Sequence, residues 1–334
     1  MSLPAAAELG QIITAYWHSQ AVYVAAELGI ADLLRDGPQQ VNALAQATQT
    51  NEDALFRLLR ALASLGIFNE VAPRMFGLTP LAELLRSDVP GSQRSLARMA
   101  GGEQFQAWGD LLYSVRTGRT AFDHRFGKPV FDWLAEHPEQ ARIFDGAMVG
   151  IHGRETAAVI AAYDFSGIKV LADVGGGNGS NLTAVLQAHP SLRGVLFDLP
   201  HVVENARSAM AAAGVAARCE CIGGNFFIEV PVDADTYMMR HIIHDWNDEQ
   251  SQTILRCIRR RIPAQGRLLL IESVIPPGND PFSAKFLDLT MLAIPGGKER
   301  TRDEYQSLLA AAGFQLTRIV PTKTEISVIE STPA

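Results

Sequence analysis

The chain has 334 residues, of which 47% are hydrophobic and 19% charged, and its formal net charge is -7. This composition is typical of a globular protein with a substantial buried core, and it excludes a disordered chain. The acidic balance disfavours binding to the phosphate backbone of a nucleic acid.

Three features bear on cross-linking and location: the number of cysteines, the apolarity of the N-terminus and the length of the apolar stretches. Its three cysteines, Cys219, Cys221 and Cys257, are too few for a disulfide framework. The first 20 residues contain no unbroken apolar run of the kind found in signal peptides. No uncharged apolar stretch reaches the roughly 18 residues that a membrane span requires. We therefore expect a cytoplasmic protein with no membrane segment.

The N-terminal third has the pattern of a winged helix. Apolar residues at helical spacing predict helices at 21–34, at 41–48 and from a cap at Thr50 or Asn51 to a stop at Gly66. Short strands at 67–71 and 75–78 follow, and Thr79-Pro80 opens another helix.

A winged helix can bind DNA, and its charge bears on whether this one does. Between Asp36 and Arg94 there are five basic and six acidic residues, about -1 in total. A module that reads a DNA groove needs a basic face instead. We therefore expect a dimerisation element that also covers the substrate, with no nucleic acid as partner.

From Lys169 onward, short apolar runs alternate with helical segments, whereas 91–120 and 131–163 are expected to be helical. This alternation predicts a doubly wound α/β sheet that ends in an antiparallel pair. The expected strands are 170–174, 194–198, 217–222, 236–239, 267–273, 315–320 and 325–329. We expect three regions: an N-terminal domain at 1–100, a helical linker and acceptor-pocket region at 101–165, and a catalytic domain at 166–334.

A glycine-rich loop follows the first of these strands, in Leu171–Ser180 (LADVGGGNGS). Glycines let the backbone approach a ligand closely, and this edge of a doubly wound sheet is where nucleotides bind. A dinucleotide fingerprint would require glycine at Ser180. Asp173, two residues before the G-x-G-x-G run, suits a cationic cofactor better than a diphosphate. The pattern favours S-adenosylmethionine.

The next two strand ends also carry suitable groups. Asp198 follows Gly179 by nineteen positions and can accept hydrogen bonds from both ribose hydroxyls. Asn225 and Phe226 follow the third strand and could bond and stack an adenine ring. Singly, the glycines could be turn formers, Asp198 a helix cap and Phe226 a core residue, but their joint placement at successive strand ends favours a cofactor site.

His244 lies between the fourth strand and a helix capped by Asn247, at the same sheet edge. Glu272 ends the next strand, and Glu299 lies in a glycine-containing loop. A histidine flanked by carboxylates is an oriented general base, which a phenol with a pKa of about 10 needs at neutral pH. Alternatively, Glu299 pairs with Lys298 or Arg300. The other histidines nearby in sequence, His241, His189 and His201, are interpreted as structural.

Together the motifs LADVGGGNGS, FDLP, GGNFF, HIIHDWNDE and PGGKERT give the chain a resemblance to small-molecule O-methyltransferases of the caffeic acid, acetylserotonin and bacterial antibiotic-pathway type. The resemblance covers nearly the whole chain. It implies a Rossmann-like methyltransferase sheet, mostly parallel with the last strand antiparallel, behind an N-terminal winged-helix domain that forms a homodimer. It also implies His244 as base with Glu272 and Glu299, and no metal. The cofactor residues are expected to be Asp173, Gly175, Gly177, Asp198, Leu199, Asn225, Phe226, Arg240 and Trp246.

Four positions depart from the family pattern. Asn225-Phe226 replace the usual Asp-Met, Arg240 replaces a common Lys, and Ile294 stands where many relatives have Asn. The last change makes the acceptor pocket more apolar. Its expected lining is Trp108, Phe131, Phe144, Met148, Phe286, Met291 and Ile294.

The expected reaction is in-line transfer of a methyl group from S-adenosylmethionine to a hydroxyl of a small aromatic or polyketide-like acceptor, leaving S-adenosylhomocysteine. Two alternatives remain. One is an enzyme of the same fold that methylates nitrogen or carbon, or that hydroxylates or decarboxylates. The other is a non-enzymatic winged-helix regulator, which the acidic balance and the complete catalytic set disfavour.

Overall fold

The computed structural model describes residues 4–334, which form two compact units. Unit 1 comprises the chain up to Asp110 together with Val130–Gly153, and unit 2 comprises Leu111–Pro129 with Arg154–Ala334. The expected linker region at 101–165 is thus divided between them. None of the helices in the described chain is both long and apolar enough to cross a membrane.

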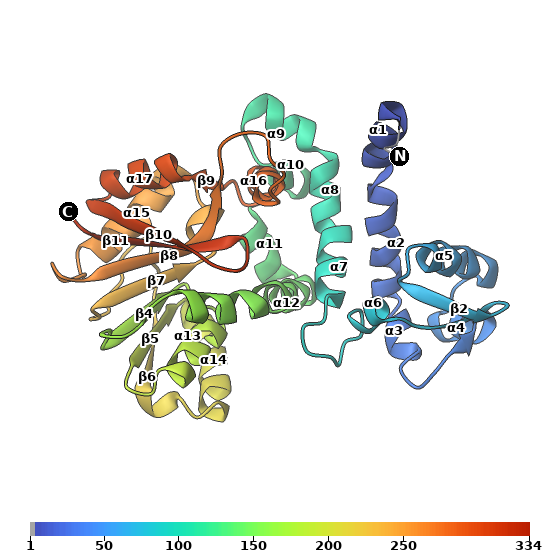
Figure 1. Cartoon of the computed structure of the whole chain (residues 1–334), viewed down its shortest axis with the longest axis horizontal. Helices are drawn as coiled ribbons and strands as arrows, with labels where there is room; N and C mark the ends of the chain where they lie inside the picture. The colour runs from blue at the N-terminus through green and yellow to red at the C-terminus, as the bar shows by residue number, and fades with distance from the viewer. Residues whose placement is uncertain (1–3) are drawn as a thin grey trace. The chain divides into compact units, whose positions relative to one another are not determined.

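Unit 1 is built from helices and one small sheet (Figure 1). Its sheet has the order β1-β3-β2, with β1 at Gln39–Gln40, β2 at Phe68–Ala72 and β3 at Met75–Leu78. Its helices are α1 (Ala5–Thr14), α2 (Tyr16–Glu27), α3 (Ile30–Leu33), α4 (Val41–Thr48), α5 (Glu52–Ser64), α6 (Pro80–Glu83), α7 (Arg94–Gly101), α8 (Glu103–Gly109), α11 (Val130–Glu136) and the first part of α12 (Pro138–Ala162).

The predicted winged-helix pattern is present in unit 1. Asn51 caps α5 by accepting from the backbone N–H of Ala54, and Thr79 caps α6 by accepting from that of Ala82. A core of buried side chains from α2 to α6, including Leu44, Leu59 and Phe76, joins these elements. The short strand β1, which the sequence did not predict, adds an edge to the hairpin through an antiparallel pairing with β3.

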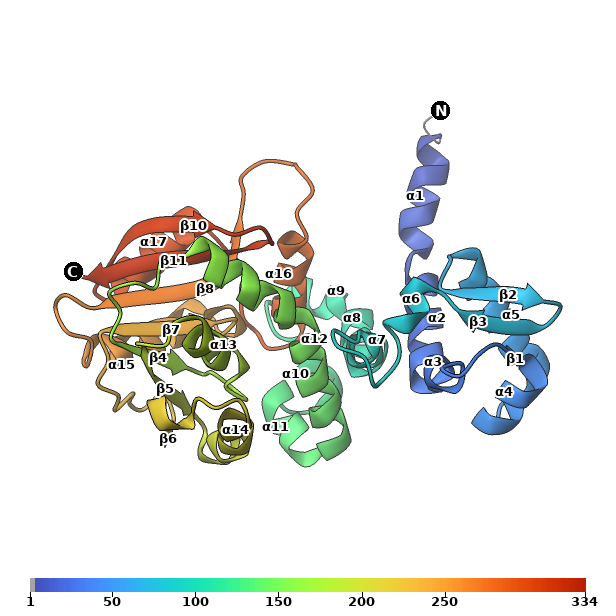
Figure 2. The ribbon, with the colours of Figure 1, turned by 60° about the horizontal axis from the view of Figure 1, so that its bottom comes forward.

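Unit 2 contains a twisted sheet with the strand order β10-β11-β8-β7-β4-β5-β6, which Figure 2 shows from one edge to the other. Strands β6, β5, β4, β7 and β8 are parallel, and β11 runs antiparallel to both β8 and β10. The strands are β4 (Val170–Val174), β5 (Arg193–Asp198), β6 (Cys219–Gly223), β7 (Thr236–Arg240), β8 (Arg267–Ile275), β10 (Phe314–Pro321), β11 (Ile326–Pro333) and the short β9 (Arg300–Thr301), which pairs with β8. The predicted fold is confirmed.

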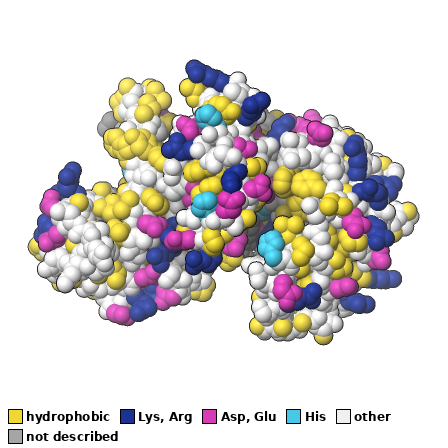
Figure 3. Space-filling view, turned by 180° about the vertical axis from the view of Figure 1, so that it is seen from behind, with side chains coloured by type: hydrophobic (Ala, Val, Ile, Leu, Met, Phe, Trp, Pro, Cys, Tyr) yellow, Lys and Arg dark blue, Asp and Glu magenta, His cyan; other side chains and the backbone are white. Residues whose placement is uncertain are grey.

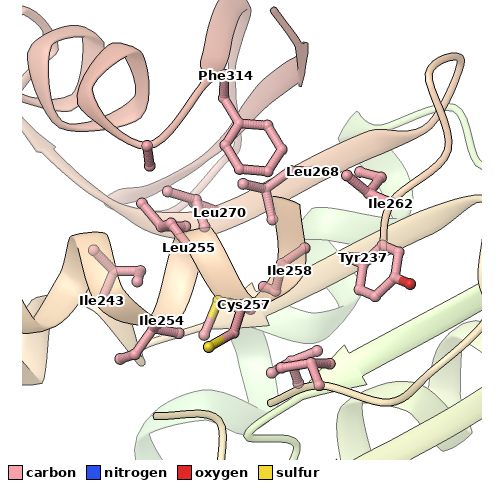
Figure 4. Close-up of a cluster of buried hydrophobic side chains, with 14 of the residues drawn as sticks. Tyr237, Ile243, Ile254, Leu255, Cys257, Ile258, Ile262, Leu268, Leu270 and Phe314 are labelled. Carbon is pink, nitrogen blue, oxygen red and sulfur yellow. The ribbon is translucent and has the colours of Figure 1, made fainter. Parts of the chain in front are cut away.

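Helices cover both faces of this sheet. Against one face, the final part of α12 packs with α13 (Ser180–Ala188) and α14 (Pro200–Ala212). Against the other pack α15 (Asp248–Arg259) and α17 (Arg302–Ala311). Figure 4 shows this second core, in which Leu255 and Ile258 of α15 meet Leu268 and Leu270 of β8. The remaining helices of unit 2, α9 (Leu111–Thr117), α10 (Ala121–Phe126) and α16 (Ala284–Ala293), contact one another.

The boundaries of β6 differ from those expected. Ala216–Arg218 form a 3-10 turn, so the strand starts at Cys219 instead of at 217. Cys219 and Cys221, two positions apart in the strand, face the same side, and each thiol lies 3.9 Å from the sulfur of Met210. They are packing residues of the core on that face.

Candidate active site

The loop after β4 brings the backbone close to its neighbours. Gly175, Gly177 and Gly179 have φ angles of 74°, 58° and 74°, which residues with a Cβ rarely adopt. A Cβ on Gly175 would lie 2.7 Å from the Ile242 side chain and 3.6 Å from the Phe226 ring. Around Gly177, by contrast, no atom would lie within 4 Å of a Cβ. The loop therefore offers open space beside its backbone at Gly177.

Asp198, at the end of β5, is bonded to this loop. Its Oδ2 accepts from the backbone N–H of Gly177 at 2.8 Å, and its Oδ1 accepts from that of Leu199 at 2.7 Å. Burial raises the pKa of Asp198, and the two backbone donors oppose this shift. Asp198 does not cap α14, whose first turn begins with no side-chain cap. Its carboxylate bridges the ends of β4 and β5 instead.

Asp173, in β4, is buried beneath the same loop. No hydrogen-bond partner for its Oδ2 is found in residues 4–334. Burial raises its pKa to about 7, although the positive charge of Arg240 opposes this. A buried carboxyl oxygen without a donor is costly unless a cation or a donor reaches it. This orphaned oxygen, together with the open space at Gly177, fits a ligand with cationic groups such as S-adenosylmethionine.

An aromatic group stands next to the glycine loop. Phe226 and Phe227 both contact Trp246 edge-on, with ring centroids 6.2 and 4.7 Å apart. Asn225 accepts a hydrogen bond from the backbone N–H of Phe227, which holds the turn that presents these rings. Phe226 also lies beside Gly175, so the residues predicted to contact an adenine ring lie next to the glycine loop.

His244 lies on a 3-10 turn, Ile243–Asp245, between β7 and α15, whose N-terminus is capped by Asn247. The imidazole is buried, with its Nδ1 2.6 Å from Oε1 of Glu299 and 3.7 Å from Oε2 of Glu272. Its Nε2 lies 3.6 Å from a carboxylate oxygen of Asp245. Burial alone would lower the pKa of His244, but the three acidic groups outweigh it and raise that pKa to about 10.

Glu272 is fully buried in β8. Its Oε1 accepts from the backbone N–H groups of Ile242 and Ile243, at 3.1 and 2.9 Å, and so fixes the turn that carries His244. Burial raises the pKa of Glu272 above its ordinary value. Its Oε2 lies near two imidazoles, that of His244 and that of His241 at 3.8 Å.

The loop before β9 delivers Glu299 to the histidine. The backbone N–H of Lys298 donates to the carbonyl oxygen of His244 at 2.8 Å, and that of Glu299 donates to Asp288 at 2.9 Å. The alternative ion pairs of Glu299 are not formed, because Lys298 pairs with Glu304 and Arg300 pairs with Asp248. Glu299 is instead a partner of His244.

Sequence reasoning missed several residues of this site. Asp245 follows His244 directly and could have been considered for that reason. His241, interpreted as structural, lies with its ring centroid 5.0 Å from that of His244. Arg300 is fully buried and donates to the carbonyl oxygens of Ile243, Trp246 and Lys298, which no local pattern indicates.

The expected acceptor-pocket residues lie in both units. Trp108, on α8, Phe131, on α11, and Phe144 and Met148, on α12, belong to unit 1, where the rings of Phe131 and Phe144 meet edge-on at 6.2 Å. In unit 2, Met291 and Ile294 are buried at the end of α16, whereas Phe286 is 71% exposed. The pocket itself remains a prediction.

A metal ion has one candidate group within residues 4–334. Ligand atoms of His241, His244 and Glu272 lie within 4.8 Å of one another. The Nδ1 of His244 is already engaged with Glu299 at 2.6 Å, however, and the three residues were not predicted as ligands.

The fold and this site define a class of enzyme. A mostly parallel sheet, with a glycine loop after its first strand and a carboxylate after its second, carries a buried histidine flanked by acids. This is an S-adenosylmethionine-dependent methyltransferase. The O-methyltransferase domain model matches residues 108–315 and the O-methyltransferase dimerisation domain model matches residues 11–88, so the chain belongs to the O-methyltransferase family. The dimerisation domain agrees with the predicted homodimer.

Three comparisons place it within this family. Phenazine O-methyltransferase PhzM of Lysobacter antibioticus is 48% identical over 99% of this chain and 97% of that protein. The crystal structure of LaPhzM superposes with a TM-score of 0.96 at 48% identity, over 99% of this chain and all of that one. The neocarzinostatin-pathway O-methyltransferase NcsB1, in complex with S-adenosylmethionine and 2-hydroxy-5-methyl naphthoic acid, is 32% identical with a TM-score of 0.84, over 95% and 96% of the two chains.

Proposed function

We propose that this enzyme transfers the methyl group of S-adenosylmethionine to a phenolic hydroxyl of a small, flat aromatic acceptor, with His244 as general base. The observation that carries the proposal is the buried contact between Glu299 and His244, two residues after Ile242, whose side chain lies against Gly175 of the glycine loop. The contact sits at the sheet edge where a cofactor of this class binds.

Several residues of the chain would bind the cofactor. Asp198, bonded to Gly177, would accept from the ribose hydroxyls, and the orphaned oxygen of Asp173 would face a cationic part of the cofactor. Phe226 and Trp246 would flank the adenine, with Asn225, Leu199 and Arg240 nearby. Once bound, the cofactor supplies an electrophilic methyl group.

His244 would take the proton of the acceptor hydroxyl. Its Nδ1 is held by Glu299, so Nε2 is the nitrogen left to face an acceptor. Glu299 would fix the ring and balance the imidazolium that forms. Glu272 would hold the turn through Ile242 and Ile243. Placing the hydroxyl and the base at contact distance supplies much of the rate.

The acceptor class follows from two lines of support. Met291 and Ile294 are buried apolar residues, and as predicted pocket residues they would give the acceptor an apolar lining. PhzM is named for a phenazine and NcsB1 was solved with a naphthoic acid, both of which are fused aromatic compounds. We therefore propose a fused-ring phenol or a polyketide-like hydroxyaromatic. The predicted cytoplasmic location remains a prediction that cell fractionation would test.

The test is a methyl-transfer screen with labelled S-adenosylmethionine against phenols, quinols and aromatic polyketides, read by mass spectrometry. We expect an O-methylated product whose formation falls by about 10²–10⁴-fold in His244→Ala and His244→Gln. Cofactor affinity should be unchanged, and the loss should be smaller for more acidic phenols. Wild-type rates in His244→Ala with a weakly acidic phenol would overturn the assignment of the base. Products methylated only on nitrogen or carbon would overturn O-methylation.

A further inference from the structure

The carboxyl group of Glu272 has two oxygens in different surroundings. Oε1 accepts two backbone hydrogen bonds, whereas for Oε2 no hydrogen-bond partner is found in residues 4–334. Oε2 lies 3.7 Å from Nδ1 of His244 and 3.8 Å from Nδ1 of His241, midway between two imidazole rings. A fully buried carboxylate with an unsatisfied oxygen is costly, so this group calls for a proton or a donor.

The His241 ring is held in one orientation. Its Nε2 lies 2.8 Å from a carboxylate oxygen of Glu155 on α12. Because a carboxylate can only accept, Nε2 carries the hydrogen and Nδ1 of the neutral ring is an acceptor. The backbone of His241 has a φ of 52°, an uncommon conformation for a residue with a Cβ, and such strain gathers at functional sites.

The acceptor nitrogen of His241 therefore faces the unsatisfied oxygen of Glu272. Two hydrogen-bond acceptors do not attract each other. A proton on Oε2 of Glu272 would make that oxygen a donor to Nδ1 of His241. Closing the gap from 3.8 Å to hydrogen-bond length requires a shift of about 1 Å. We infer that His241, oriented by Glu155, is a positioning residue that keeps Glu272 in its protonated form, so that His244 acts beside one ionised glutamate instead of two.

Burial points to the same protonation states. It holds the pKa of His241 well below its ordinary value, with the charges of His244 and Arg240 adding to the effect. It also raises the pKa of Glu272. The titratable groups that face Glu272 are His241 at the end of β7, His244 and Asp245 on the 3-10 turn, Glu299 on the loop before β9, and Tyr305 on α17.

The protonation state of Glu272 affects the pKa of His244, the proposed general base. Each carboxylate near an imidazole stabilises the imidazolium and raises its pKa. With Glu272 neutral, one of the three acidic groups that raise the pKa of His244 to about 10 no longer does so. The pKa is then lower, and more of the histidine is ready to accept a proton at neutral pH. His241 thus tunes the general base without touching the acceptor. This inference rests on the proposed function of His244.

Infrared difference spectroscopy on the ligand-free enzyme tests the protonation state directly. The wild type should show the C=O stretching band of a protonated carboxylic acid, and Glu272→Gln should remove it. His241→Phe keeps an aromatic ring at this position but removes the acceptor nitrogen, and should weaken or abolish the band. His241→Gly, which tolerates the positive φ, should do the same if the Phe variant folds poorly. A wild type without a band that Glu272→Gln removes, or a band unchanged in both His241 variants, would overturn the inference.

The pH dependence of methyl transfer supplies the second measurement. Loss of the acceptor lets Glu272 ionise beside His244, so the acid limb of kcat/KM should move to higher pH by about 1 unit in both His241 variants. His189→Asn replaces a half-buried histidine far along the chain from this turn and should leave the profile unchanged. A profile unmoved by either His241 substitution would contradict the inference. Because the spectra need no acceptor, a failed methyl-transfer screen would count against the proposed function alone.

Discussion

The guanidinium of Arg300 donates to the carbonyl oxygen of Ile243 at 3.1 Å, which joins the loop that carries Glu299 to the turn that carries His244. The same side chain donates to the carbonyl oxygen of Trp246 at 3.0 Å and to Asp248 at 2.8 Å. Arg300 is fully buried although Asp248 is largely exposed. It acts as a clamp that holds the two halves of the catalytic pair at contact distance.

Replacing Arg300 by Met should therefore cost stability. The substitution keeps much of the volume but leaves several buried carbonyl oxygens without a donor, so we expect a loss of roughly 3 kcal/mol in the free energy of unfolding. Urea unfolding followed by circular dichroism measures it. Arg302→Met, on the exposed start of α17, is the control and should change stability by less than about 0.5 kcal/mol. Equal losses in the two variants would refute the clamp.

Gly297 is the second structural requirement of this loop. A Cβ there would lie 2.0 Å from the carbonyl oxygen of His244 and 2.4 Å from the carbonyl carbon of Asp245, both backbone atoms that cannot rotate away. Gly297→Ala should push the loop off the turn and displace Glu299, and turnover should fall roughly 10- to 100-fold. Cofactor affinity, measured by calorimetry, should stay close to that of the wild type, since the glycine loop after β4 is not involved. Full turnover in this variant would mean that the loop is free to move.

Asp198 should set cofactor affinity. Removing its carboxylate in Asp198→Ala eliminates a charge-assisted acceptor and frees the backbone N–H of Gly177, so binding of S-adenosylmethionine should weaken by about 1.5–3 kcal/mol. Glu204→Gln, on the exposed face of α14, is a matched removal of charge that should have little effect. Calorimetry with S-adenosylmethionine, S-adenosylhomocysteine and NAD checks both points. Tighter binding of NAD than of either adenosyl compound would contradict the cofactor assignment.

Much of the fold was predictable because its signals are local. The apolar run of β4 next to four glycines indicates a strand, a turn and a helix without any distant information. Asn51, Thr79 and Asn247 cap the helices that they were expected to cap or open. The strand β1 was missed because its two residues pair with β3, more than thirty positions away, and carry no pattern of their own.

The site was less predictable because its distant partners are joined only by the fold. The glycines of its loop indicated that Glu299 could reach His244, but 55 positions separate the two, and from the sequence an ion pair with Lys298 or Arg300 remained an alternative. Arg300 and Glu155 reach the site from other elements, and no spacing rule connects them to it. The orientation of His241 depends on a backbone φ that sequence patterns do not specify.

The homodimer should depend on the apolar face of α1. Leu9, Ile12 and Ile13 are 58%, 68% and 63% exposed in the single chain, and hydrophobic side chains gather over this helix at the upper left of Figure 3. Exposed apolar patches of this kind mark interfaces. The double substitution Ile12→Glu with Ile13→Glu should halve the mass measured by light scattering, whereas Gln11→Glu on the same helix should not. A double variant that stays dimeric would place the interface elsewhere.

Cofactor affinity should depend on pH through Asp173. Burial raises the pKa of this carboxyl to about 7, so a substantial part of the ligand-free enzyme carries it uncharged at neutral pH. The charged form attracts a cation and the neutral form does not. A bound cation therefore favours ionisation, and by linkage the affinity for S-adenosylmethionine must rise as pH increases from about 6 to about 8. Titration calorimetry across this range measures the slope.

The matched variant is Asp173→Asn, which keeps the shape of the side chain but cannot ionise. It should bind S-adenosylmethionine more weakly, with an affinity that stays nearly constant over the same pH range. Asp303→Asn, an exposed substitution on α17, controls for the change of net charge and should retain the wild-type slope. S-adenosylhomocysteine lacks the sulfonium charge, so its affinity should respond less to pH than that of S-adenosylmethionine. If the wild type bound the sulfonium cofactor equally well at both ends of the range, the orphaned oxygen of Asp173 would not be facing the cation, and the cofactor's charged part would have to be placed elsewhere along the loop.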